Sequence, residues 1–196
     1  MIQPKQATSR ANTRTFRSAA AWGAWLAAHH GRSPGVWLRF FKKSTGKQIL
    51  THALALDEAL CWGWIDGQAR PYDDESWMQR YTPRRPRSAW SKRNRDLVAR
   101  LEHEGRMQPS GRAQVDAARG DGRWDRAYES PANAQVPDDF LRALRRHKGA
   151  LAFFRGLNRA NVFAIAYRLQ TAKRPETRQR RLAQLVQMMK DGERLH

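Results

Sequence analysis

The stretch Val36-Trp37-Leu38-Arg39-Phe40-Phe41-Lys42 decides how the first half of the chain folds. Its β-branched and aromatic residues are typical of a strand, and the residues that follow, Ser44-Thr45-Gly46-Lys47, are typical of a turn. The Ala- and Trp-rich segment 16–29 has the apolar spacing of a helix, which Gly31 and Pro34 end. The sequence therefore predicts a helix that leads into a β-strand.

A second helix and two more strands are predicted after this turn. Thr51 is a suitable N-cap for an apolar helix, after which Cys61-Trp62-Gly63-Trp64-Ile65-Asp66-Gly67 looks extended. Another strand is expected at residues 76–82. The order helix, strand, helix, strand, strand predicts an α+β fold with a small, mostly antiparallel sheet.

Beyond Pro83 the pattern changes to helices separated by Gly and Pro. Ser91 should cap one helix, and Pro137 and Pro175 stand where two others begin. The C-terminal half is therefore expected to be helical. We predict a disordered basic arm over residues 1–14, an α+β subdomain over 15–90, and a helical subdomain over 91–196 packed on it.

Charge is the most unusual property of the composition. Of the 196 residues, 37 are Lys or Arg and 18 are Asp or Glu, which gives a net charge of +19. Residues 1–50 hold nine cations and no acid, and residues 151–196 hold ten cations against three acids. Such a charge favours polyanionic partners. The excess of 29 Arg over 8 Lys is also what the codon usage of a GC-rich genome produces, so selection for binding is one of two readings.

Several functional classes lack their sequence signals. With 40% hydrophobic residues and eight Trp the chain can build a core, which argues against collagen, coiled coil and porin. The single Cys61 cannot form an intrachain disulfide, which favours the cytoplasm, and the longest apolar run, residues 19–28, is half of the roughly 20 residues that span a bilayer. The six His have no metal-ligand spacing, and no nucleotide-binding motif occurs, so we expect no metal and no cofactor.

Two basic segments are candidate anion sites. In residues 83–94, Arg and Lys flank a Trp at the start of a helix, where unpaired N–H groups and the helix dipole attract anions and a Trp could stack on a base. The alternative is a solvated linker with Trp90 as a core anchor. Residues 172–181 are a second basic segment at a helix start, unless they are a solvated face with Glu176 paired to Arg180. The candidate residues are Arg84, Arg85, Arg87, Trp90, Ser91, Lys92, Arg93, Asn94, Arg174 and Arg178.

The run Trp62-Gly63-Trp64-Ile65-Asp66 is a candidate small-ligand pocket. Strand alternation would send Trp62, Trp64 and Asp66 to one face, where a desolvated carboxylate could act as a base or bind an Arg. Arg80 is expected to line the same pocket. The alternative is two core tryptophans and a turn aspartate. Cys61 would be a nucleophile only with a base such as His52 beside it, and burial is the expected state.

Several of these motifs together resemble the YdeI/OmpD-associated, or bacteriocin-protection, family. The resemblance runs from about Thr15 over nearly the whole chain and departs from the family at Trp62, where Phe is more usual. The motifs are 36–40 (VWLRF), 59–67 (ALCWGWIDG), 81–86 (YTPRRP), 88–94 (SAWSKRN), 121–128 (DGRWDRAY), 136–139 (VPDD) and 172–178 (AKRPETR). The family implies a role in resistance to antimicrobial peptides or in envelope stress, possible envelope-associated partners, and no agreed catalytic residues.

The residues and the resemblance lead to three hypotheses of function. The first is a non-enzymatic cytoplasmic protein that binds nucleic acid or another phosphate-bearing partner. The alternative is an enzyme or small-ligand-binding protein that uses Trp62, Trp64, Asp66 and Arg80. The third is an envelope-protection factor that acts through a partner. Direct capture of cationic peptides is disfavoured, because a protein of charge +19 repels them.

Overall fold

The structure, a computed structural model, describes residues 13–47, 50–129, 133–172 and 174–195. Residues 1–12 of the predicted arm lie outside the described residues. The chain divides into two compact units. The first comprises Met1–Ser88 and Asp96–Gly122, and the second comprises Ala89–Arg95 and Arg123–His196. Residues 96–122, which the sequence analysis placed with the helical part, group with the sheet in this division.

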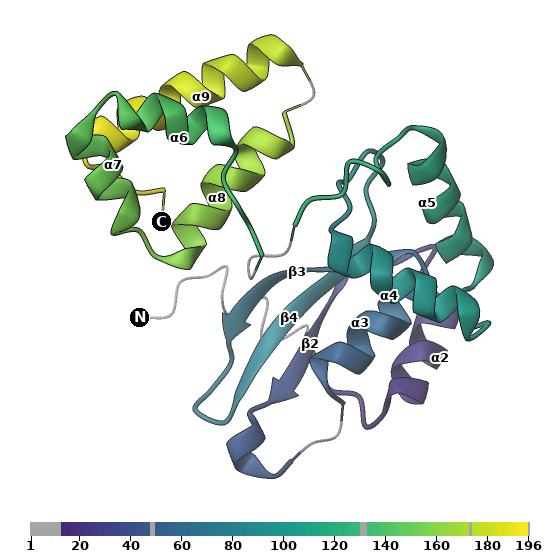
Figure 1. Ribbon diagram of the computed structural model, residues 1–196. Helices are drawn as coiled ribbons and strands as arrows, with labels where there is room; N and C mark the ends of the chain where they lie inside the picture. The colour runs from purple at the N-terminus through teal and green to yellow at the C-terminus, as the bar shows by residue number, and fades with distance from the viewer. Residues whose placement is uncertain (1–12, 48–49, 130–132, 173, 196) are drawn as a thin grey trace. The chain divides into compact units, whose positions relative to one another are not determined.

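The first unit is built on a four-stranded sheet whose order is β1-β2-β4-β3. Its strands are β1 (Thr13–Arg14), β2 (Val36–Phe41), β3 (Trp64–Pro71) and β4 (Ser76–Pro83). The long strands pair antiparallel (Figure 1). Strand β1 pairs parallel with β2. Thr13 and Arg14, assigned to the arm from sequence, thus form an edge strand.

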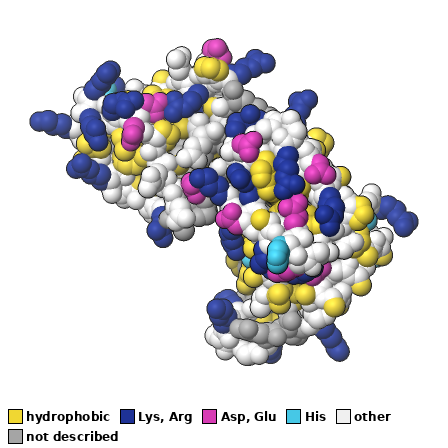
Figure 2. Space-filling view, turned by 45° about the vertical axis from the view of Figure 1, so that its right-hand side comes forward, with side chains coloured by type: hydrophobic (Ala, Val, Ile, Leu, Met, Phe, Trp, Pro, Cys, Tyr) yellow, Lys and Arg dark blue, Asp and Glu magenta, His cyan; other side chains and the backbone are white. Residues whose placement is uncertain are grey.

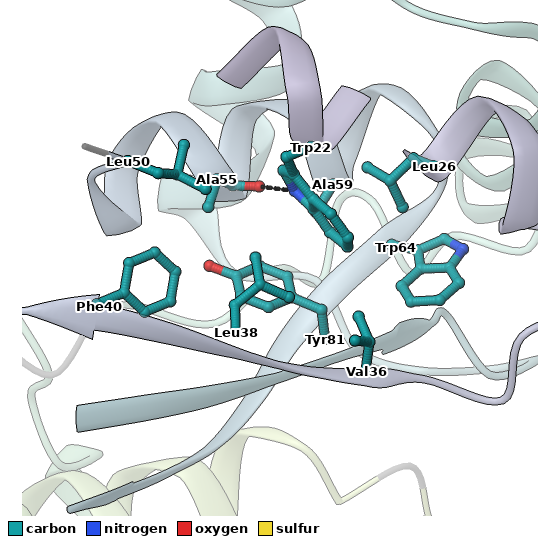
Figure 3. Close-up of a cluster of buried hydrophobic side chains, with 10 residues drawn as sticks. All are labelled: Trp22, Leu26, Val36, Leu38, Phe40, Leu50, Ala55, Ala59, Trp64 and Tyr81. Carbon is teal, nitrogen blue, oxygen red and sulfur yellow. Dashed lines mark hydrogen bonds between the residues drawn. The ribbon is translucent and has the colours of Figure 1, made fainter. Parts of the chain in front are cut away.

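Helices α2 (Ala19–His29) and α3 (His52–Cys61) cover one face of this sheet (Figure 1). Both begin at a side-chain cap: Ser18 Oγ accepts from the Ala21 N–H at 3.1 Å, and Thr51 Oγ1 accepts from the Leu54 N–H at 3.3 Å. The core lies between helices and sheet, and the indole of Trp22 donates to the carbonyl of Ala55 at 3.0 Å (Figure 3). The short helix η1 (Lys43–Thr45) follows β2.

The strand predicted to begin at Cys61 begins later. Cys61 is still helical, Trp62 caps α3, and Gly63 turns the chain with φ of 75° before β3 starts at Trp64. A positive φ strains any residue with a side chain, so Gly63 permits this abrupt change from helix to strand.

Two further helices are α4 (Lys92–His103) and α5 (Pro109–Gly120). Ser91 caps α4 as predicted, because its Oγ accepts from the Asn94 N–H at 3.1 Å. Gly111 of α5 lies against the carbonyl end of α3, close to Cys61. This approach fixes the position of α5 within the first unit.

The second unit contains α6 (Asp138–Arg145), α7 (Lys148–Arg155), α8 (Arg159–Gln170) and α9 (Pro175–Lys190). Its core includes Phe140, Leu144, Ile165, Leu185 and Met189. Strands in the N-terminal half and helices in the C-terminal half confirm the predicted α+β class. No helix within the described ranges is long and apolar enough to span a bilayer.

Candidate functional site

The first basic segment forms a turn in the first unit. Arg84 is buried, its N–H donates to the carbonyl of Gly63 at 3.0 Å, and its guanidinium lies 3.5 Å from Ser88 Oγ. The Ser88 N–H donates to the carbonyl of Arg85, and Arg87 has a φ of 66°. Pro at the second position and positive φ at the third are features of a type II turn. Arg85 and Arg87 are therefore displayed to solvent, while Arg84 is not.

Trp90, proposed from sequence as a stacking residue, is a core residue of the second unit. It is 2% exposed, and its ring centroid lies 5.0 Å from that of Trp124. The hydroxyl of Ser91 is taken up by capping α4, and Asn94 is buried. This geometry matches the core-anchor alternative and leaves no open face of Trp90 for a base.

The other cations of the predicted anion site differ in their surroundings. Lys92 pairs with Glu129, whereas Arg93 and Arg174 are exposed. Arg178 binds Asp139 through two hydrogen bonds, of 2.5 and 3.0 Å, which tie α9 to α6. This hydrogen bonding and the positive charge of Arg178 lower the pKa of the Asp139 carboxyl below its usual value. Arg178 is thus a structural residue within its own unit.

Replacing Asp139 with Asn should destabilise the protein only where the carboxylate is charged. Because the folded state lowers the pKa of Asp139, the ion pair stabilises the fold above the unfolded pKa and is lost as pH falls through the lowered value. We expect Asp139→Asn to cost about 1 kcal/mol at neutral pH, after allowance for solvent screening. Urea unfolding of the wild-type protein and of Asp139→Asn measures this difference in the free energy of unfolding. A difference that persists undiminished in strong acid would contradict this assignment.

A dense group of exposed cations lies where α6 passes into α7. Arg142, Arg145, Arg146 and Lys148, here called the basic elbow, are all exposed. Arg145 and the C-cap residue Arg146 lie on the same side of α6 as Arg142, since they follow it by three and four residues. None of the four has an acidic partner among the described residues, in contrast to Lys92 and Arg178. On the face drawn in Figure 2, Lys and Arg side chains outnumber Asp and Glu.

The helix dipole explains only part of the basic elbow. Cations are favourable in the last turn of α6, but Lys148 stands in the first turn of α7, where the dipole disfavours a positive charge. Like charges at these spacings also repel one another. An external polyanion would relieve this repulsion. The elbow was not among the sites predicted from sequence, although its signal is the run Arg142-Ala143-Leu144-Arg145-Arg146-His147-Lys148.

The pocket predicted from Trp62, Trp64, Asp66 and Arg80 does not form in the predicted way. Trp64 is 1% exposed, and its indole donates to the carbonyl of His30 at 3.2 Å, so it belongs to the core. Trp62 caps α3 and packs on the ring of His30. Arg80 lies beside Tyr81 in β4 and so on the opposite face from Asp66, because Asp66 pairs directly with Tyr81. The alternative of two packed tryptophans fits this arrangement better.

The structure brings Asp66 together with His52 instead. Asp66 Oδ2 lies 3.1 Å from His52 Nε2, and both side chains are about a quarter exposed, 26% and 27%. Cys61, at the opposite end of α3, is nine residues from His52, a rise of about 13 Å. Burial raises the pKa of the Cys61 thiol to about 11. Cys61 is therefore a buried core thiol and not a nucleophile served by His52.

No group of three or more His, Cys, Asp or Glu that could hold a metal ion occurs in the part of the chain that the structure describes.

Two family models match different parts of the chain. Residues 14–114 match the family described as Domain of unknown function (DUF8412). Residues 133–192 match the family described as Bacteriocin-protection, YdeI or OmpD-Associated. The resemblance to the latter family over nearly the whole chain was therefore too broad, because its match is confined to the C-terminal helices. No curated protein and no solved structure matches the chain.

Proposed function

The chain belongs to the family described as Domain of unknown function (DUF8412), and we propose that it is a binding protein whose basic elbow engages nucleic acid through the phosphate backbone. The observation that carries the proposal is the cluster of four exposed cations without acidic partners in the described residues. Phosphates are the anions that Arg and Lys bind most readily on nucleic acids.

The scarcity of acidic side chains in residues 133–192 supports this placement. In the first unit Arg39, Lys47, Arg100, Arg106 and Arg119 each pair with an acidic side chain. The segment 133–192 instead holds thirteen Lys and Arg against four Asp and Glu, and Arg178 occupies one of those four. Residues 133–192 therefore carry a net charge of +9, an excess that residues 1–50 also carry.

The spacing of the elbow suits a phosphate backbone. Arg142 and Arg146 are separated by about 6 Å along the helix axis. One strand of duplex presents about two phosphates over such a distance. Backbone contacts carry no sequence information, and Trp90, the one residue proposed to stack on bases, is buried. We therefore expect binding that depends on salt and not on base sequence.

A protective role would follow from this chemistry only through an anionic partner. The elbow lies within residues 133–192, which match the family described as Bacteriocin-protection, YdeI or OmpD-Associated. A cationic surface repels cationic peptides, so protection by direct capture of them is disfavoured. Binding to nucleic acid is the form of the proposal that the exposed elbow supports.

The proposal is tested by fluorescence anisotropy of the full chain with labelled single strands and duplexes of several sequences. We expect dissociation constants on the order of 10⁻⁵ M near physiological salt, similar for all sequences and weaker at higher salt. Anionic vesicles are titrated in parallel. Binding to vesicles without measurable binding to either nucleic acid would overturn the proposal in favour of a membrane surface.

A further inference from the structure

A small cavity lies at the end of β2, beside the first turn of α3. Its volume is about 210 Å³, and its walls include the rings of Phe40, Phe41 and Trp77 together with Lys42, Lys43 and His52. Phe40 and Trp77 are stacked, with their centroids 5.0 Å apart. Stacked rings beside a few polar groups are the usual lining of a small-ligand site.

His52 supplies an oriented polar group in this wall. Its ring packs on Trp77 and Phe40, with centroid distances of 5.7 and 6.0 Å, and its Nε2 is held by Asp66. No partner of Nδ1 is found among the described residues. A histidine whose one nitrogen is fixed by a carboxylate presents the other nitrogen in a defined direction.

A buried hydroxyl also lacks a partner near this end of the core. Tyr81 is fully buried, and no described residue hydrogen-bonds its Oη. In Figure 3 the hydroxyl is directed toward the side of the cluster where Phe40 and Leu50 lie, and both of these residues line the cavity. Burial and the nearby charge of Asp66 raise the pKa of Tyr81, so the hydroxyl keeps its proton. An unsatisfied buried hydroxyl is costly, which is why such groups commonly mark a bound water or ligand.

The charges around the cavity favour an anion. Lys47 pairs with Glu75 at 2.7 Å, but Lys42 and Lys43 have no acidic partner within the described ranges. Thr51 caps α3 with its side chain, so the first turn of a ten-residue helix directs its positive end to this region. The polar groups that meet here are thus donors or cations, apart from Asp66 behind His52 and Glu75 paired with Lys47.

From these contacts we propose that the cavity binds a small aromatic carboxylate, with the ring against Phe40 and Trp77 and the carboxylate toward His52 and the lysines. The volume corresponds to about seven water molecules, enough for one six-membered ring with its carboxylate. The proposal is independent of nucleic-acid binding, because it concerns the first unit, and the basic elbow belongs to the second.

The test is calorimetric titration of the full chain with benzoate, benzamide and acetate. Benzamide keeps the ring without the charge, and acetate keeps the charge without the ring. We expect benzoate to bind at least tenfold more tightly than either. His52→Gln should lower the affinity for benzoate at least tenfold. His147 is an exposed histidine of the second unit, and His147→Gln should leave this affinity unchanged. Equal affinity for all three probes, absence of benzoate binding, or an unaffected His52→Gln would overturn the proposal.

A second variant protects the test against a folding defect. Lys42 and Lys43 are exposed, so the double variant Lys42→Gln/Lys43→Gln should keep the melting temperature of the wild-type protein. Its affinity for benzoate should be several-fold lower. If benzoate binding is unchanged in it, no anion site exists here. Substitution of the basic elbow should weaken the binding of nucleic acid and leave the binding of benzoate unchanged. The two proposals can therefore be refuted independently.

Discussion

Gly111→Ala should greatly lower the free energy of unfolding of the protein. A Cβ at this position would lie 2.1 Å from the carbonyl oxygen of Cys61 and 2.9 Å from that of Leu60, which are backbone atoms that cannot rotate aside. The Cys61 oxygen is further fixed by the Gln108 N–H at 3.0 Å. We expect a loss of about 3 kcal/mol, because helix α5 must move away from α3. The melting temperature should fall by roughly 6–12 °C.

Gly120→Ala is the matched control in the same helix. A Cβ on Gly120 would meet nothing within 4 Å, so the substitution should be neutral or stabilise the protein by up to about 1 kcal/mol. Thermal unfolding of both variants by circular dichroism makes the comparison. Equal melting temperatures for the two variants would show that α5 does not pack on the end of α3 in this way.

The largest functional effect is expected from the elbow variant, in which Arg142, Arg145, Arg146 and Lys148 all become Gln. If two of the four face phosphates at a time, affinity for duplex DNA should fall on the order of 100-fold at about 50 mM salt. The fold should be kept, since the four side chains are exposed and repel one another. Fluorescence anisotropy gives the affinity, and circular dichroism gives the fold.

A control variant of equal charge separates the elbow from the net charge. Arg17, Arg32, Arg85 and Arg87 are exposed residues of the first unit, and their replacement by Gln removes the same four charges. We expect only a several-fold loss of affinity, from the weaker overall field. A loss as large as that of the elbow variant would point to the turn at Arg85 and Arg87, or to charge alone, as the source of binding.

The sequence predicted those parts of the fold that local chemistry specifies. Thr51 and Ser91 cap their helices, and Pro137 and Pro175 stand at helix starts, as expected. The first residue of β3 was wrong because an apolar helix end and an apolar strand look alike until Gly63 is seen to adopt positive φ. Strand β1 has two residues, too few for a periodic pattern.

The candidate site was less predictable because it depends on contacts between distant residues. Trp90 is buried by Trp124, and Arg178 is paired with Asp139, which lies 39 residues away. Asp66 was predicted to act as a base or to bind an Arg, but the structure places it beside His52. The elbow needed no contact between distant residues, since its four exposed cations lie within seven residues of sequence, 142–148.

The most direct measurement of the central claim is the salt dependence of duplex binding, compared between the wild-type protein and the elbow variant. Each phosphate contact contributes about 0.9 to the slope of log K against log salt concentration. We predict that the variant has a slope shallower by roughly 2 to 4 units, because its lost charges no longer release counterions. Parallel lines for the two proteins would contradict the claim that the basic elbow contacts the phosphate backbone.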